Sequence, residues 1–257
     1  MGVAAPPVFP DRPVFVARFK DIERWSHDGI LRAASQPNIS RTQTWPLTRL
    51  GNVIADLENG WSPKCHDHQA REGQWGVLKL GAVSFGIFNE SQNKELPERL
   101  KPRPAYEVRN GDVLISRANV VRYVGACAYV EETRPKLMLC DKIFRVRFLK
   151  SSKLLPQFLT EIMRLPSVRE QIETRLTGTS PTMKNISKPA LLDLRFPLPE
   201  LNDQRSLITD LTTGRQTATT KRTEAQTLRA SAWAVFESAL FTASDAAEIS
   251  AEVESAS

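Results

Sequence analysis

The chain has 257 residues, 41% of them apolar and 25% charged, which is enough apolar material for a buried core and excludes a disordered protein. No stretch approaches the roughly 18 consecutive apolar residues of a membrane span, and prolines interrupt residues 1–13, where a signal peptide needs an unbroken apolar run. We therefore expect a cytoplasmic protein. The three cysteines are an odd number and form no C-x-x-C pair, so we expect reduced thiols and neither a disulfide framework nor a zinc ribbon.

The N-terminal part of the chain predicts two short helices. Residues 1–44 form a proline-rich lead, with a short helix expected within residues 18–34. In the segment 45–60 (WPLTRLGNVIADLENG), apolar residues recur at helical spacing and a glycine follows them. This pattern predicts a second helix that ends at Gly60.

Four segments rich in Val, Ile and aromatic residues and bounded by Gly, Asn or Pro predict the strands of a sheet: 76–80, 112–116, 123–130 and 137–148. In the last segment Phe144, Val146 and Phe148 alternate with Arg145 and Arg147. Successive side chains of a strand point to opposite faces, so this alternation predicts a sheet with one basic face.

A helical segment follows the strands. Ser151 or Ser152 is placed to cap a helix with Pro156 in its first turn, and the helical pattern runs toward Gly178. Pro166 lies inside this segment and predicts a kink or a break. Together with the strands, the segment predicts a mixed α/β domain of the α+β class over residues 45–199.

The last part of the chain has a different composition, because every proline lies at or before Pro199 and Gly214 is the only glycine after Gly178. Over residues 200–241 a heptad pattern steps alternately four and three residues from position 207, and only Lys221 interrupts it. The pattern predicts a coiled-coil-forming helix of about 60 Å that needs a partner helix. Residues 242–257, with four acids and no base, are expected to form a disordered acidic tail. The residues of the predicted partner-binding seam are Leu207, Leu211, Ala218, Ala225, Leu228, Ala232 and Val235.

The positive charge is concentrated in one part of the chain. Residues 101–150 contain eleven Lys and Arg against five Asp and Glu, so this fifth of the chain carries the whole net charge of +6. Such a concentration favours a polyanionic partner. A solvated basic surface without a partner is the alternative.

The sequence carries no familiar catalytic signature. It contains no G-x-G-x-x-G, G-x-x-x-x-G-K-[ST], G-x-S-x-G or H-E-x-x-H, and no Asn-Pro-Pro-Tyr or Asp-Pro-Pro-Tyr, which an amino-group DNA methyltransferase would carry. Residues 65–68 (Cys-His-Asp-His) are potential metal ligands, but a zinc site needs about four ligands and the only other histidine is His27. We therefore expect a polar loop there, no metal site, and a protein that is not an enzyme.

Four stretches of the chain together resemble one family. They are WPLTRLGNVIADLENGWSPK, VLKLGAVSFGIF, RNGDVLISRAN and LTGTSPTMKNISKPALLDLRFPLPELNDQRSLI. In the last stretch Gly178-Thr179 leads to Asn185-Ile186 and then to Gln204 at the start of the long helix. In this order and spacing they resemble the DNA-specificity subunit of type I restriction–modification systems over residues 45–241.

The resemblance implies a target recognition domain over residues 45–199 and a conserved helix that docks against another such helix and against modification subunits. Family members usually carry two recognition domains and two helices. This sequence has one of each, which suggests a half-length form that is a homodimer or pairs with a second specificity chain.

The function implied is sequence-specific binding of double-stranded DNA, which directs a partner N6-adenine methyltransferase, and in some assemblies a restriction subunit, to a bipartite site. S-adenosylmethionine would be bound by the partner, so no cofactor is expected here. A coiled-coil adaptor or decoy that binds modification subunits without reading DNA is the alternative. A stand-alone nuclease is disfavoured because no acidic metal cluster is visible in the sequence.

The chemistry of the side chains assigns the candidate DNA-binding residues to two roles. Hydroxyls and backbone amides of glycine-rich loops, together with nearby lysines, are suited to phosphates. Side chains with donors and acceptors in a turn after a strand are suited to base edges. The candidates for phosphate contact are Ser62, Lys64, Lys142, Thr179, Ser180 and Lys184. The candidates for base contact are Ser116, Arg117, Asn119 and Arg122, and Lys79 and Asn185 complete the set.

Overall fold

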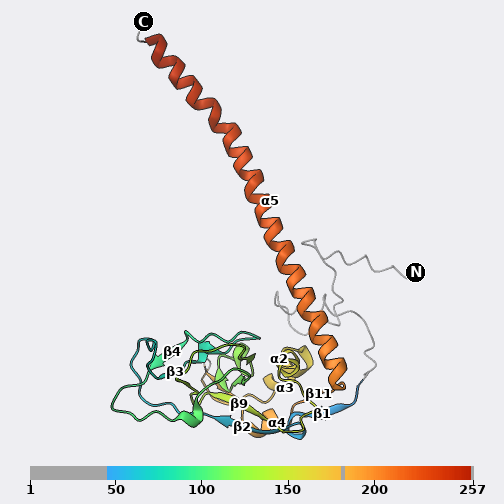
Figure 1. Ribbon diagram of the computed structural model, residues 1–257. Helices are drawn as coiled ribbons and strands as arrows, with labels where there is room; N and C mark the ends of the chain where they lie inside the picture. Colours follow the sequence, from blue (N-terminus) through green and yellow to red (C-terminus); the bar gives the residue numbers. More distant parts are fainter. Residues whose placement is uncertain (1–44, 181–182, 256–257) are drawn as a thin grey trace, which may run out of the picture. The chain divides into compact units, whose positions relative to one another are not determined.

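The computed structural model describes residues 45–180 and 183–255, with side chains described up to residue 241. The short helix expected within residues 18–34 lies outside this part of the chain. The described residues form a mixed α/β domain that is followed by one long helix, as Figure 1 shows. The predicted fold class is therefore confirmed.

The domain contains two sheets and two short strand pairs. The larger sheet is antiparallel, in the order β2 (Ile54–Asn59), β9 (Ile143–Phe148), β5 (Val113–Ser116) and β7 (Cys127–Tyr129). The smaller sheet has the order β4 (Asn93–Glu95), β3 (Gly76–Leu78) and β8 (Leu137–Met138), and its β3–β8 pair is parallel. The short antiparallel pairs are β1 (Leu47–Arg49) with β11 (Arg195–Pro197), and β6 (Ala118–Asn119) with β10 (Lys184–Asn185).

Helices surround one end of the domain and continue the chain beyond it. The domain helices are α2 (Pro156–Ile162), α3 (Pro166–Glu173) and α4 (Lys188–Leu192). The long helix is α5 (Leu201–Ser255). Single 3₁₀ turns lie at η2 (Leu50–Asn52), η3 (Leu80–Ala82), η4 (Pro104–Tyr106) and η5 (Val121–Tyr123).

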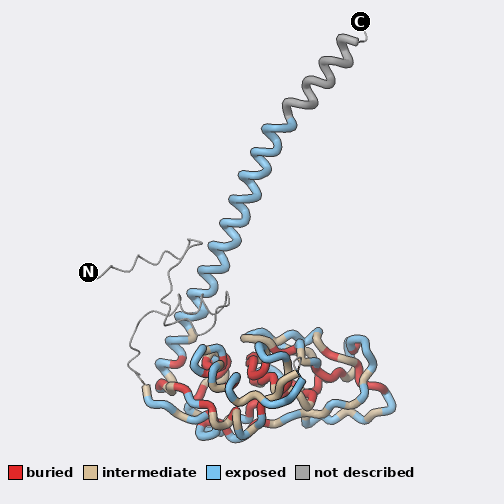
Figure 2. The backbone as a smooth tube through the Cα atoms, turned by 180° about the vertical axis from the view of Figure 1, so that it is seen from behind, coloured by how far each residue is buried: buried red, intermediate tan, exposed pale blue. Residues whose placement is uncertain are grey.

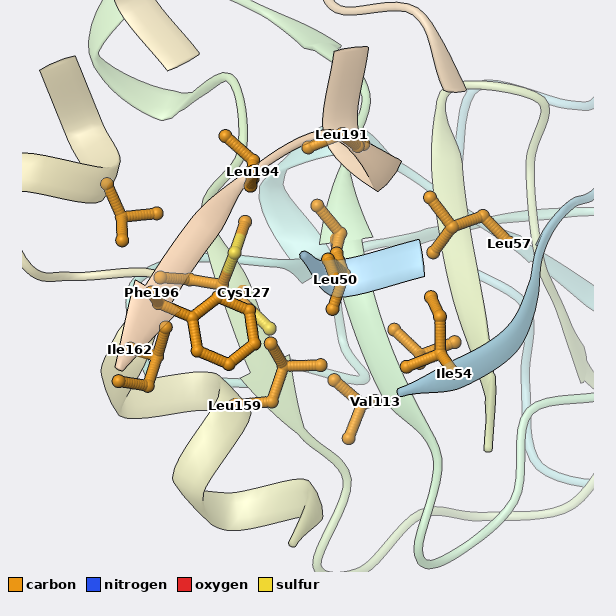
Figure 3. Close-up of a cluster of buried hydrophobic side chains, with 14 of the residues drawn as sticks. Leu50, Ile54, Leu57, Val113, Cys127, Leu159, Ile162, Leu191, Leu194 and Phe196 are labelled. Carbon is orange, nitrogen blue, oxygen red and sulfur yellow. The ribbon is translucent and has the colours of Figure 1, made fainter. Parts of the chain in front are cut away.

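The four-stranded sheet is buried on both faces. Val113 and Ile115 of β5 belong to one hydrophobic cluster, and Leu114 between them belongs to the other. Figure 3 shows the first cluster, in which Ile162 of α2 and Phe196 of β11 lie close together. The second cluster joins the two sheets. A core on each face of the sheet explains why the central strand β5 begins with three consecutive apolar residues.

The helix predicted over residues 45–60 is wrong, because this segment forms β1, η2 and β2. A bulge between Ile54 and Asp56 interrupts the pairing of β2 with β9 and shifts the side-chain alternation by one residue. Ile54 and Leu57 therefore both face the first core. Because of the bulge, two apolar residues three positions apart lie on the same side of a strand, and this spacing had indicated a helix.

Gly60 has a different role from the predicted helix end. Its N–H donates a hydrogen bond to the carbonyl oxygen of Cys140 (3.1 Å). A Cβ atom built on Gly60 would lie 2.0 Å from the carbonyl oxygen of Leu139. The glycine thus permits a close approach of two backbone segments that any side chain would prevent.

The four predicted strand segments all contain strands, with narrower bounds. Residues 76–80 contain β3, 112–116 contain β5, and 123–130 contain β7. Residues 137–148 divide into β8 and β9, which belong to different sheets. The segment between these two strands contributes to the candidate site described below.

The predicted basic face of the last strand is wrong for Arg145, whose side chain is only 2% exposed. Its guanidinium donates to the carboxylates of Glu58 (2.9 and 3.1 Å) and Asp112 (3.2 Å), and to the carbonyl oxygens of Ala105 and Glu107 (both 2.7 Å). Arg147, two residues further on, is 48% exposed and also binds Glu58. The face that carries Arg145 is thus an interior ion network and not a basic surface.

The proline at position 166 breaks the predicted helical segment, because α2 ends at Ile162 and α3 begins at Pro166. The predicted cap is wrong, since Leu155 precedes the first helical residue without a side-chain cap. Ser152 instead accepts a hydrogen bond from the N–H of Leu154 (3.1 Å) and donates to the carbonyl oxygen of Val53 (3.1 Å). Its hydroxyl stabilises the turn before α2 and connects that turn to Val53, the residue before β2.

The long helix α5 begins at Leu201, close to the predicted boundary. It runs to Ser255, so residues 242–255, expected to be part of a disordered tail, are helical. From residue 209 to 241 every residue is exposed, as the pale blue of this part of the helix shows in Figure 2. Its exposed apolar residues include Leu228 (71%) and Val235 (66%) of the predicted seam. No helix in the described ranges combines the length and hydropathy needed to cross a bilayer.

Candidate nucleic-acid interface

Pairing of β6 with β10 brings two distant parts of the chain together. Asn119 pairs with Lys184, and Ala118 pairs with Asn185, in antiparallel register. The N–H of Ile186 continues this contact and donates to the carbonyl oxygen of Arg117 (3.0 Å). The turn predicted to read bases therefore lies beside the Gly178–Asn185 stretch predicted to hold phosphates.

A third and a fourth stretch join the same place through Arg117. Its N–H donates to the carbonyl oxygen of Lys142 (2.9 Å), and its Nη1 donates to that of Asp141 (3.3 Å). The N–H of Asp141 donates to Oγ of Ser62 (3.1 Å), and the Ser62 hydroxyl donates to the Asp141 carboxylate. We call this set the polar junction; its members are Ser62, Arg117, Asn119, Asp141, Lys142, Lys184 and Asn185.

Ser116 does not belong to the surface of the polar junction. Its side chain is fully buried in β5, and its Oγ accepts a hydrogen bond from Nδ2 of Asn119 (3.4 Å). This burial contradicts the expectation that Ser116 contacts DNA. Ser116 instead positions Asn119, whose Oδ1 also accepts from the N–H of Val120 (2.8 Å).

Arg117 is half-buried and only partly satisfied. Its guanidinium lies 5.6 Å from the ring centre of Phe144. Its Nε atom is buried and has no hydrogen-bond partner in the described part of the chain. Buried donors are rarely left without an acceptor, so this position is suited to an acceptor from a bound molecule or a water.

The described residues at the two ends of the Gly178–Asn185 stretch contact each other beside Arg117. Thr177 and Asn185 exchange two backbone hydrogen bonds (2.8 and 2.9 Å), and Nζ of Lys184 donates to the carbonyl oxygen of Gly178 (2.7 Å). Gly178 has φ of +106°, a conformation that favours glycine. The loop presents the exposed residues Thr179 and Ser180 next to the polar junction.

Three predicted DNA-binding residues lie in other surroundings. Lys64 and Lys79 are exposed in the loops before and after β3, and the N–H of Lys79 donates to the carbonyl oxygen of Gln92 (2.8 Å). Arg122 is exposed on η5, with its guanidinium 5.8 Å from the ring centre of Tyr123. Among the described residues, no hydrogen bond or ion pair joins these three side chains to the polar junction.

Asp141 is the member of the polar junction that the sequence reasoning missed. Its backbone and carboxylate both bind Ser62, and its carbonyl oxygen accepts from Arg117. It is the only acidic residue from Thr133 to Lys150, a segment with six basic residues. An isolated acid within a basic segment was the signal available for it.

The potential metal ligands at 65–68 form a polar loop. The rings of His66 and His68 stack with their centres 5.3 Å apart, and Nζ of Lys94 binds the Asp67 carboxylate at 2.6 Å. This hydrogen bond and the positive charge of Lys94 lower the pKa of Asp67. Among the described residues no group of three or more His, Cys, Asp or Glu is arranged to hold a metal ion.

No family model matches the chain. Comparison with curated proteins finds two relatives, both named as specificity subunits of type I restriction enzymes. The chain is 34% identical over 168 residues to the type I restriction enzyme EcoEI specificity subunit of Escherichia coli, a match that covers 65% of this chain and 28% of the relative. The chain is a homologue of type I restriction specificity subunits. A second relative, the MjaVIII specificity subunit of Methanocaldococcus jannaschii, is 24% identical over 173 residues and covers 64% of this chain and 38% of the relative.

A solved structure shares the fold of this homologue. It comes from work on complex assembly and conformational transition of a type I restriction–modification system. The match covers 75% of this chain and 44% of the solved chain, with a TM-score of 0.51 and 21% sequence identity. The resemblance predicted from the four stretches is confirmed. The chain spans less than half the length of the relatives it matches.

Proposed function

We propose that this homologue is a DNA-binding specificity subunit, which catalyses no reaction itself and directs partner N6-adenine methyltransferase subunits to a bipartite DNA site. The kinship with type I specificity subunits supports this proposal. The partner would supply S-adenosylmethionine and the reacting groups. A restriction subunit would join the same complex in systems that cleave DNA.

The observation that carries the proposal is the polar junction built by the β6–β10 pair. It gathers donors and acceptors from four stretches of the chain around Arg117 and Asn119. Arginine and asparagine are the side chains that most readily bind guanine and adenine edges with two hydrogen bonds. Lys142 and Lys184, on either side of them, are suited to the phosphates that flank such bases.

Methylation mapping tests the whole proposal. The chain would be produced together with N6-adenine methyltransferase subunits encoded in the same genome, and modified adenines would be located by long-read sequencing of the host DNA. We expect modification at one interrupted motif, which disappears when the chain is omitted. Methyltransferase binding without any preferred motif would favour the adaptor alternative.

Salt titration tests the contact with DNA separately. Arg145 is internal, so ten of the eleven basic residues in 101–150 remain available for phosphates. If about five of them bind phosphates, log K should fall with log salt with a slope of about −4 to −5, near 0.9 for each contact. A slope shallower than about −1 would mean that this region is only a solvated basic surface.

A further inference from the structure

The long helix α5 is attached to the domain at two points. The first is Gln204, whose side chain is fully buried at the start of the helix. Its Oε1 accepts from the N–H of Leu155 (2.9 Å), and its Nε2 donates to the carbonyl oxygens of Lys153 (2.7 Å) and Pro199 (2.8 Å). Ile208, one turn further along, packs against the first core. These contacts hold the beginning of α5 against the domain.

The second point is an ion pair that joins α5 to α2. Both terminal nitrogens of Arg215 bind the carboxylate of Glu161, at 2.6 and 2.7 Å. A two-pronged contact of this kind defines orientation as well as distance. Among the described residues it is the one ion pair between α5 and the domain.

Glu161 is held in place by the element that carries it. Its neighbours Leu159 and Ile162 on α2 are buried in the first core, so the helix that presents the carboxylate is anchored there. Arg164 lies 3.7 Å from the same carboxylate and adds a second positive charge. Arg215 therefore binds a carboxylate whose position is set by the domain.

The two points of attachment are far enough apart along α5 to define the direction of the helix. Arg215 lies eleven residues beyond Gln204, which is about 16 Å along an α-helix. Over the roughly 60 Å of helix to residue 241, each degree of tilt moves the far end by about 1 Å. One base pair of DNA adds about 3.4 Å, so a tilt of a few degrees equals one base pair of spacing.

We infer that the Glu161–Arg215 ion pair is a strut that fixes the direction of α5 relative to the domain and thereby the spacer length of the bipartite site. The part of the inference that concerns spacer length rests on the proposed function. The strut itself is a property of the chain and is measurable without DNA. Glu161 and Arg215 act as positioning residues and contact no base.

Spin-label distances test the strut. One label would be placed at Glu132 of the domain and one at Ser231 of α5, both exposed, in full-length chain with Cys65 changed to serine and diluted with unlabelled protein. Cys127 and Cys140 are buried, which raises the pKa of their thiols to about 12 and about 11, so they stay protonated and unlabelled. We expect a narrow distance distribution that broadens in Arg215→Ala and narrows again in the charge-exchanged pair Glu161→Arg with Arg215→Glu.

Arg222→Ala provides the matched control, since Arg222 is exposed two helical turns beyond Arg215 on the same side of α5. It should leave the distances unchanged. An unchanged distribution in Arg215→Ala would overturn the strut.

Methylation mapping with the same variants tests the role in spacing. The quantity measured is the ratio of methylation at sites whose spacer is one base pair longer or shorter to methylation at sites with the wild-type spacer. Arg215→Ala should raise this ratio by up to about fivefold, the range expected from one well-formed surface ion pair. The charge-exchanged pair should restore the wild-type ratio. Broadened distances with an unchanged spacer ratio would overturn the spacing role. Failure of the wild-type chain to direct methylation to any interrupted motif would overturn the proposed function and the spacing role together, while the distances would still decide the strut.

Discussion

Two arginines of β9 bind the same carboxylate in very different surroundings. Arg145 is 2% exposed and binds Glu58, Asp112 and two backbone carbonyls, whereas Arg147 is 48% exposed and binds Glu58 alone. A buried guanidinium is tolerated only when its donors are satisfied. The network also holds the segment that contains η4 against the larger sheet.

Removal of the buried arginine should therefore cost far more stability than removal of its neighbour. We expect Arg145→Met to lower the free energy of unfolding by about 3–5 kcal/mol, because two carboxylates and two carbonyls lose their partner. Arg147→Met should cost less than about 1 kcal/mol, as is usual for an exposed ion pair. Urea unfolding of both variants measures the difference. Equal losses of unfolding free energy in the two variants would show that the buried network contributes no more stability than the exposed ion pair.

Asn119 and Lys142 lie in the polar junction with different chemistry. Asn119→Ala should weaken binding to the preferred duplex by about 1–3 kcal/mol and leave random DNA unaffected, because its amide group is suited to a base edge. Lys142→Ala should weaken binding to both duplexes equally, as loss of a phosphate contact does. Fluorescence anisotropy with the two duplexes separates these outcomes. Equal losses on both duplexes for Asn119→Ala would contradict its assignment to base contact.

At the scale of elements, α5 contains a glycine at the third heptad position of the predicted seam, between Leu211 and Ala218. Gly214 lies in a regular helix, and a Cβ atom there would meet nothing within 4 Å in the single chain. Glycine normally costs about 1 kcal/mol relative to alanine inside a helix. Its place in the seam is consistent with a close approach of a partner backbone.

The substitution Gly214→Ala should thus have opposite effects on the helix and on its pairing. We expect higher helicity by circular dichroism, from the propensity gain of about 0.8–1.0 kcal/mol. We also expect weaker association of chains in sedimentation equilibrium, because the methyl group would enter the close contact. Thr220→Ala, which lies outside the seam on the same helix, should raise helicity without weakening association. Unchanged association in Gly214→Ala would argue against a close approach at this position.

At the scale of the whole molecule, α5 leaves a group of large apolar side chains uncovered in the single chain. Leu228, Trp233, Val235, Phe236, Leu240 and Phe241 are each more than half exposed within one part of the helix. Clustered exposed apolar side chains of this size mark a binding surface. A second helix from another specificity segment or from a modification subunit would bury them.

Leu228→Asp tests whether the seam holds chains together. A buried unpaired carboxylate costs several kcal/mol, so this variant should sediment as a single chain and lose bipartite methylation while its domain unfolds at the wild-type urea concentration. Gln226→Asp, two residues away and outside the seam, should behave as the wild type. A single copy of the wild-type chain in a fully active complex, without a second specificity chain, would refute pairing through α5.

The features that the sequence alone determined are those that depend on local spacing. The long helix follows from a heptad pattern free of proline, the positions of β3, β5, β7, β8 and β9 follow from short segments rich in β-branched and aromatic residues, and the break at Pro166 follows from a missing N–H. The ordered stretches that carry the family resemblance are also a property of the chain itself. Each of these signals lies within a few tens of neighbouring residues.

The tertiary structure decided what depends on distant partners. Residues 47–49 and 54–59 form strands because β11 and β9 pair with them, and Arg145 is internal because Glu58, 87 residues earlier in the chain, supplies the opposing charge. The candidate site was predicted as residue types, but its assembly through the β6–β10 pair and the burial of Ser116 were not. Local patterns report which side chains face inward. Only the folded chain decides which strand, charge or carbonyl meets them there.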